Sequence, residues 1–185
     1  MKDNIFTDKL HKNNVSKEHA QSLVSGLLLF RDISYEIDAY PERVIENIFN
    51  YPIQSDIIFY PCDIIELRQI FINDSIFSQR SLCLFSFGLA KKYLSGYCVW
   101  VGISNSEIKG EAIGGILLSD NIYDIKKKIK RIYVNEELNP QYILDINKIV
   151  TEECPNIDLD VLGNIAALKE PLIAKKKETF NLKSS

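Results

Sequence analysis

Three short apolar segments in the middle of the chain restrict its possible folds more than any other feature. They span residues 82–87, 97–103 and 111–119, and they are rich in β-branched and aromatic residues. Such runs at hairpin spacing are typical of strands in an antiparallel sheet. Helical spacing of apolar residues appears on both sides of them, and a chain of 185 residues suits one ordinary domain. We therefore predict a single α+β domain with a central, mainly antiparallel β-sheet flanked by N- and C-terminal helices.

The segment before the sheet predicts further helices and strands. Apolar residues at helical spacing indicate a helix over about 17–31, with Ser16 as its N-cap. Strict alternation over 33–39 is typical of a half-exposed strand whose polar face carries Glu36 and Asp38. The other elements expected here are a helix from Pro41 to Pro52, a strand over 56–60, and a helix over 63–71 with Asp63 and Glu66 as a capping box.

The remaining segments give a mixed prediction. Residues 88–96 are expected to form a hairpin loop, and the Gly114-Gly115 pair to form a bulge or a close backbone contact. Residues 122–132 fit a helix, although 131–135 alternates weakly and fits a strand. Two C-terminal helices are expected over 140–155 and 159–168. The polar residues 1–15 and 174–185 predict flexible ends around a folded region that spans 16–173.

Charge, cysteines and targeting signals exclude several classes of protein. The net charge of −3 argues against broad electrostatic binding of nucleic acid. The four cysteines form no C-x-x-C pair, and their spacing fits no zinc site, so we expect free thiols and no metal or cofactor. The longest strongly apolar stretch, residues 23–30, is far too short to span a membrane, and no apolar segment follows Met1 as in a signal peptide. A cytoplasmic protein is the expectation.

Groups suited to catalysis are sparse. The two histidines, His11 and His19, both lie outside the predicted core, and no phosphate-binding or nucleophile motif occurs. One alternative is a metal-dependent nuclease that uses Asp63, Glu107 and Lys109, because an E-x-K sequence can form half of such a site. Glu107 and Lys109 fall in a polar turn, however, so a solvated hairpin loop is the favoured interpretation. The basic run from Lys126 to Arg131 is similarly interpreted as the solvent-exposed face of an amphipathic element.

The acidic segment 32–68 gives the clearest indication of binding. It contains eight Asp and Glu residues against two Arg residues. Glu36 and Asp38 would share a strand face, while Glu42 and Glu46 lie four apart on the next helix. These four carboxylates are therefore the predicted partner-binding residues, and a basic protein is the predicted partner.

The order of elements from residue 56 onward resembles that of the SUKH superfamily of bacterial immunity proteins. The resemblance rests on 56–61, the helix 63–71, the run 82–88, and the strands at Tyr97 and Gly114. It covers residues 56–120; the family's N-terminal Trp and its Asn-Gly segment are missing, and Gly88-Leu89-Ala90 replaces its glycine-aspartate turn. The resemblance implies an α+β domain that neutralises a toxin, and it carries over no functional residue.

The function we expect is that of a non-enzymatic immunity protein, or antitoxin. It would bind a cognate bacterial toxin, such as a nuclease, and occlude the toxin's active or substrate-binding surface, without direct contact with nucleic acid or membrane. The alternatives are the nuclease-like enzyme that uses Asp63, Glu107 and Lys109, or a viral or bacterial adaptor for protein interactions.

Overall fold

The structure, a computed structural model, describes residues 2–135, 140–155 and 157–162. It is an α+β domain built on a seven-stranded sheet with the strand order β5-β6-β3-β1-β4-β8-β9. Every neighbouring pair is antiparallel except β8 and β9. The predicted fold class is therefore confirmed. The strands of this sheet are β1 (Ile57–Cys62), β3 (Leu82–Phe85), β4 (Val99–Ser104), β5 (Gly110–Ile113), β6 (Ile116–Ser119), β8 (Ile129–Asn135) and β9 (Asp158–Leu162).

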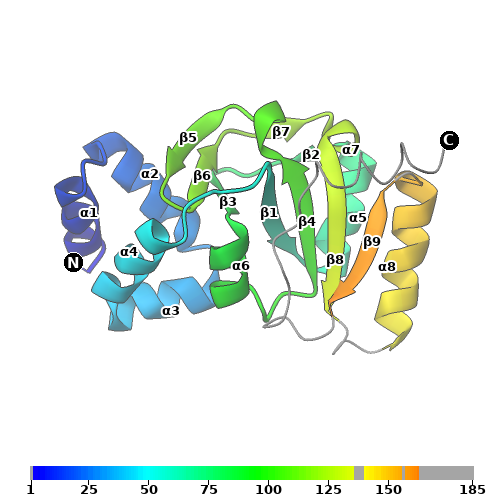
Figure 1. Cartoon of the computed structure of the whole chain (residues 1–185), viewed down its shortest axis with the longest axis horizontal. Helices are drawn as coiled ribbons and strands as arrows, with labels where there is room; N and C mark the ends of the chain where they lie inside the picture. The colour runs from blue at the N-terminus through cyan, green and yellow to red at the C-terminus, as the bar shows by residue number, and fades with distance from the viewer. Residues whose placement is uncertain (1, 136–139, 156, 163–185) are drawn as a thin grey trace, which may run out of the picture.

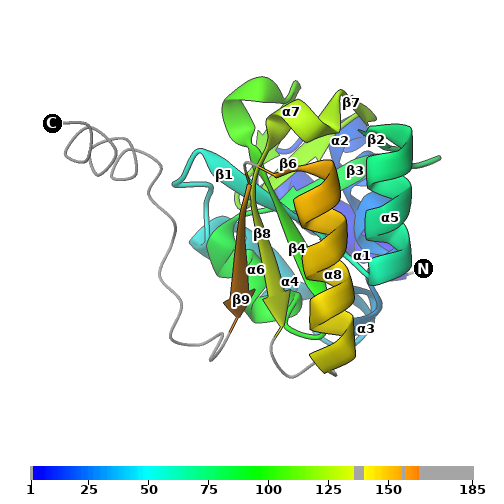
Figure 2. The ribbon, with the colours of Figure 1, turned by 90° about the vertical axis from the view of Figure 1, so that its right-hand side faces the viewer.

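Helices cover both faces of this sheet (Figure 1). The N-terminal helices and α6 pack on one face, while α5 and α8 lie side by side on the other (Figure 2). The helices are α1 (Lys2–Lys12), α2 (Lys17–Leu27), α3 (Arg31–Ala39), α4 (Pro41–Asn50), α5 (Ile64–Asn73), α6 (Phe87–Tyr93), α7 (Ile125–Lys128) and α8 (Pro140–Glu153). A short ribbon of β2 (Ser75–Ile76) and β7 (Ile122–Tyr123), and a 3₁₀ turn η1 (Asn105–Glu107), complete the fold.

Strand β1 shows why both faces of the central sheet are apolar. Ile57 and Phe59 join the core under the N-terminal helices, while Ile58, Tyr60 and Cys62 join the core under α5 and α8. Successive side chains of a strand point to opposite faces, so a central strand with a helical layer on each side must be apolar throughout.

Several predicted helices start where the sequence indicates. The Ser16 hydroxyl accepts a hydrogen bond from the backbone N–H of His19 (3.1 Å), and α2 ends at Leu27. Asp63 caps α5 by accepting from the N–H of Glu66 (2.7 Å). The Glu66 carboxylate does not complete the capping box, because it accepts a hydrogen bond from the Tyr60 hydroxyl instead. The helices predicted from Pro41 and from Pro140 are confirmed as α4 and α8.

Two predictions before and within the sheet are wrong. Residues 33–39 are part of helix α3 rather than a strand, because Ile33 and Ile37, four residues apart, are buried while Tyr35 between them is exposed. Residues 88–96 are not a hairpin loop; most of them continue helix α6, which Ser86 caps through the N–H of Leu89.

Strand order and turns also differ from expectation. Strand β1 lies between β3 and β4, so the runs 82–87 and 97–103 are not neighbours in the sheet. Gly114 and Gly115 form the tight connection between β5 and β6 rather than a bulge within one strand. The other alternative, a close backbone contact, is confirmed, because both glycines lie against the backbone at the end of α4.

The ends of the chain differ from expectation as well. Residues 2–12 form α1 instead of a flexible segment, because Phe6 and Leu10 are fully buried on one side of the helix. The predicted helix 122–132 is replaced by β7, α7 and β8, which agrees with the strand alternative for 131–135. Residues 158–162 form β9 rather than the start of a helix. The rest of that predicted helix, and the predicted tail 174–185, lie outside the described residues.

Two further findings concern thiols and membranes. Cys62, Cys83 and Cys154 are buried and Cys98 is half-buried, all as free thiols. Within the described ranges, the structure contains no helix with the length and apolar character required to cross a membrane.

Candidate functional site

The four predicted partner-binding carboxylates all lie on helices, in α3 and α4, and they do not form one surface. Glu36 and Asp38 are two residues apart on a helix, so they point to nearly opposite sides rather than sharing a face. The Glu36 carboxylate turns inward and accepts a hydrogen bond from the Tyr93 hydroxyl of α6 (3.4 Å). The prediction that Glu36 and Asp38 share one strand face is therefore wrong, while their role in partner binding stays a prediction.

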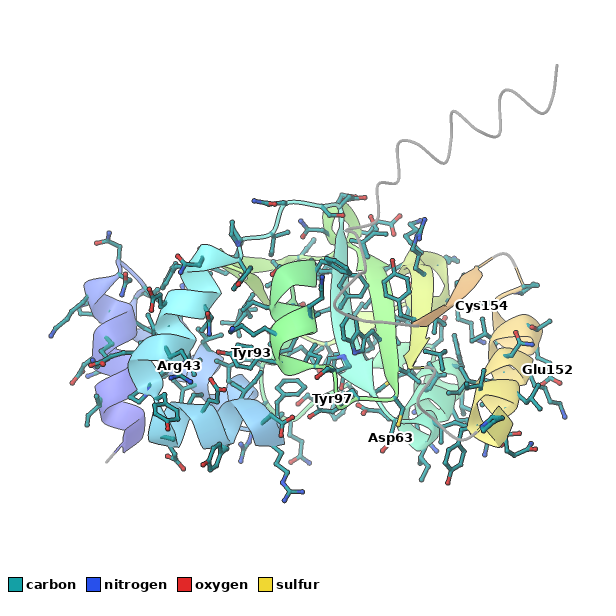
Figure 3. All side chains as sticks on the ribbon, turned by 60° about the horizontal axis from the view of Figure 1, so that its bottom comes forward. Arg43, Asp63, Tyr93, Tyr97, Glu152 and Cys154 are labelled. Atoms are coloured by element: carbon teal, nitrogen blue, oxygen red, sulfur yellow. The ribbon has the colours of Figure 1, made fainter. Side chains whose placement is uncertain are left out.

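Tyr93 links these helices from the inside. Asn47 of α4 donates to its hydroxyl oxygen (2.7 Å), and burial raises the pKa of Tyr93 to about 12, so the phenol stays protonated. Figure 3 shows Tyr93 beside Arg43 at the junction of α4 and α6. Glu36 thus belongs to a contact that holds α3, α4 and α6 together.

Glu42 and Glu46 are exposed one turn apart on α4, as predicted. Glu42 forms an ion pair with Lys9 of α1, and this hydrogen-bonded lysine lowers the pKa of Glu42. The two carboxylates border a groove between α1 and α4 of about 420 Å³, whose opposite rim carries Lys9 and Lys12. The charge of this groove is mixed, so Glu42 adds less to an acidic field than its position in the sequence suggested.

Sequence reasoning missed the aromatic part of this surface. The side chains of Tyr35 and Tyr40 are 70% and 50% exposed, large values for aromatic residues. The Arg43 guanidinium lies over the ring of Tyr40, 4.3 Å from its centroid. The signal was present in the sequence: at helical spacing, Tyr35 falls on the side of α3 opposite the buried Ile33 and Ile37.

Exposed carboxylates surround these residues. Asp32 and Asp38 are each three residues from Tyr35 on α3, and they are its neighbours on the helix surface. Glu46 lies one turn beyond Glu42 on α4. We call this set the tyrosine–acid face, which comprises Asp32, Tyr35, Asp38, Tyr40, Arg43 and Glu46.

The residues of the nuclease alternative are not brought together. Asp63 follows β1 at one end of the β1–β4 pair, whereas Glu107 follows β4 at the other end, beyond the pairing of Ile57 with Ser104. Six paired positions of strand separate them, or about 20 Å. The carboxylate beside η1 is Asp56, which accepts hydrogen bonds from the hydroxyl of Ser104 and the N–H of Ser106.

The other members of that alternative lie in ordinary surface contacts. Glu107 faces Lys130 at 3.9 Å, and Lys109 lies just before β5. Across the residues that the structure describes, no group of three potential metal-ligating side chains forms. The E-x-K sequence therefore lies in a turn, as its polar context predicted.

The basic run 126–131 is divided between two elements. Lys126 pairs with Glu153 of α8 (2.9 Å), and Lys128 donates to the carbonyl oxygen of Tyr123 (2.7 Å). The chain then leaves α7 and continues as β8, so the lysines do not line one continuous helix face.

Comparison of the chain with protein-family models and with curated proteins finds no match.

Proposed function

We propose that the chain is a non-enzymatic immunity protein that binds and neutralises a basic bacterial toxin, such as a nuclease, in the cytoplasm. The observation that carries this proposal is the tyrosine–acid face, where exposed tyrosines and a stacked arginine are surrounded by carboxylates. The resemblance of residues 56–120 to the SUKH superfamily supports the same proposal.

The residue types of the face suit a protein partner. Tyrosine and arginine are enriched among the residues that dominate binding energy, because each buries a large area at little cost in conformational entropy. Tyr35 and Tyr40 are exposed, so both can be covered by a partner without rearrangement of the core. The partner would thereby lose access to its own active or substrate-binding surface.

The surrounding carboxylates determine the chemistry of that partner. Exposed charges act mainly on the rate of encounter, so Asp32, Asp38 and Glu46 would attract a positively charged protein. A toxin that acts on nucleic acid carries such a surface, because its substrate is a polyanion.

We expect the charge-reversed variant Asp38→Lys/Glu46→Lys to associate about tenfold more slowly with its partner at low ionic strength, and to show weaker dependence on salt. These two carboxylates are chosen because Glu42 also holds Lys9, so its reversal would disturb the contact between α1 and α4. The partner to test is the protein encoded beside this gene, with association followed by biolayer interferometry.

The matched control is Glu107→Ala/Lys109→Ala, which also changes two exposed charged residues but lies at the far end of β4. It should bind like the wild type, and all three proteins should melt within about 2 °C of one another, since isolated surface charges contribute little to stability. Equal association rates for the charge-reversed variant and the wild type would refute the placement of the interface. Absence of any complex would refute the proposed function.

A further inference from the structure

A second concave site lies at one end of the central strands, where β1 ends and β3 begins, and it uses none of the residues of the tyrosine–acid face. It is a cleft of about 260 Å³ between the end of α2, the end of β1, helix α5 and the segment that precedes β3. Figure 3 labels Tyr97, which lines the cleft, and Asp63, which follows β1 at the same end of the β1–β4 pair. The cleft is smaller than typical sites for whole drug-sized ligands or cofactors, so its size suits a single side chain.

Four aromatic rings and one carboxylate line the cleft. The rings belong to Phe30, Tyr60, Phe77 and Tyr97, and the carboxylate is that of Glu66. Phe30 packs edge-on against Tyr97, with ring centroids 6.1 Å apart, and against Phe85 of the core at 5.1 Å. Phe77 is 66% exposed at the rim, so its ring is accessible to a ligand. The lining is thus a fixed aromatic wall with one exposed ring at its mouth.

Glu66 is held in place within this lining. The Tyr60 hydroxyl donates to its carboxylate (2.5 Å), and its backbone N–H is bound by the Asp63 cap. Burial raises the pKa of Glu66, and the neighbouring Asp63 raises it further, while the hydrogen bond from Tyr60 opposes both effects. The half-buried carboxylate has therefore lost part of the solvation of an exposed glutamate.

Among the residues that the structure describes, no Lys, Arg or His forms an ion pair with Glu66. Within the described part of the chain, the cleft lining also contains none of these three residue types. The faces of aromatic rings also carry negative potential. The carboxylate and the four aromatic rings of the lining therefore favour a cation over an anion.

We propose that this cleft binds the guanidinium group of an arginine side chain presented by another polypeptide. A guanidinium is planar and weakly hydrated, so it can stack on aromatic rings while its N–H groups donate to a carboxylate. Tyr60, Tyr97 and Phe77 supply the rings, and Glu66 supplies the acceptor. The two oxygens of Glu66 leave room for this contact, because the Tyr60 hydroxyl occupies one of them.

The test is an NMR titration with N-acetyl-arginine-N-methylamide, compared with its citrulline analogue. Citrulline has nearly the same shape as arginine but carries no charge and offers fewer donors. We expect the arginine compound to shift the signals of Tyr60, Phe77 and Tyr97 with a Kd on the order of 1–10 mM, as suits a single group. The citrulline compound should bind at least tenfold more weakly.

Variants identify the groups responsible. Glu66→Gln should weaken binding of the arginine compound at least tenfold, while its amide oxygen can still accept the hydrogen bond from Tyr60 and preserve the fold. Phe77→Ala removes an exposed ring and should weaken binding severalfold without unfolding the domain. Glu111→Gln, an exposed glutamate on β5, is the matched control and should bind like the wild type.

The affinity should also depend on pH. A raised carboxyl pKa means that Glu66 loses its charge at a higher pH than an ordinary glutamate, so binding should weaken as the pH falls through that pKa. The other titratable groups around it are Asp63, Tyr60, Cys62, Tyr97 and Cys98. Burial raises the pKa of each of these tyrosines and cysteines, so they stay neutral over this range.

Several results would overturn the proposal. They are equal binding of the citrulline compound, unchanged affinity in Glu66→Gln, shifts confined to residues outside the cleft, or no shift with the arginine compound at about 50 mM. The titration is finally repeated with free arginine. If free arginine binds more than tenfold tighter than the blocked compound, the cleft binds a small molecule, and the proposal that a polypeptide presents the arginine is wrong. None of these results depends on the toxin partner, so the cleft and the tyrosine–acid face are tested separately.

Discussion

Replacing Trp100 by alanine should lower the free energy of unfolding by about 3–5 kcal/mol, as for other large buried aromatic residues. Trp100, the second residue of β4, is 0% exposed. Its ring packs against Phe59 and Tyr133 with centroids 5.9 and 6.5 Å away, both in edge-to-face geometry. Its indole N–H donates to the carbonyl oxygen of Leu94 (2.8 Å), so the substitution creates a cavity and also leaves a buried acceptor without a donor.

Thermal and urea unfolding followed by circular dichroism would measure this loss. For a domain of this size the melting temperature should fall by roughly 10 °C. The variant Trp100→Phe separates the two contributions, because it keeps most of the ring volume while it removes the hydrogen bond; its loss should be clearly smaller. A Trp100→Ala protein that melts within a degree or two of the wild type would show that this side chain is not part of the core.

The second large effect is expected at Gly115, where an alanine should lower the free energy of unfolding by about 3 kcal/mol or more. A Cβ atom at this position would lie 2.1 Å from the carbonyl oxygen of Tyr51 and 2.8 Å from the hydroxyl oxygen of Ser86. The N–H of Gly115 donates to the carbonyl oxygen of Ile48, and its own carbonyl oxygen accepts from the N–H of Ser86, both at 2.7 Å. At Gly115 the backbone of the β5–β6 turn is thus in direct contact with the backbone at the end of α4, and no space remains for a side chain.

Gly96→Ala is the matched control, because a Cβ there would meet Asp32 at 3.7 Å, an ordinary contact. We expect its melting temperature to stay within about 2 °C of the wild type. Urea titrations of both glycine variants would make the comparison. If Gly115→Ala were as stable as Gly96→Ala, the close approach of α4 to the β5–β6 turn would be wrong.

The strands and helices that were predicted correctly are those in which the spacing of apolar residues fits only one type of secondary structure. The runs that became β3, β4 and β6 are buried on both faces, which a helix of that length would not be. Residues 33–39 illustrate an ambiguous pattern. Ile33, Tyr35 and Ile37 alternate like a strand, yet Ile33 and Ile37 alone satisfy a helix, and the exposure of Tyr35 decides between the two.

The sites depended on contacts between distant segments, which spacing along the chain does not reveal. Glu36 faces Tyr93, and Glu42 pairs with Lys9, so two of the four predicted carboxylates are engaged within the protein. Glu66 matched a capping box in the sequence, but its carboxylate accepts a hydrogen bond from Tyr60 on the preceding strand instead of closing that box. The aromatic cleft likewise forms only because the turn after α2 meets the ends of β1 and β4.

Growth rescue tests the central claim, neutralisation through the tyrosine–acid face, most directly. The protein encoded beside this gene would be expressed in a bacterial strain, alone and together with this chain or with its Tyr35→Ala/Tyr40→Ala variant. Both tyrosines are exposed, so the variant should fold and accumulate like the wild type, which melting temperature and immunoblotting would verify. We predict that the neighbouring protein arrests growth, that the wild-type chain restores it, and that the variant fails to do so. A wild-type chain that gives no protection, or a variant that protects equally well, would contradict the account.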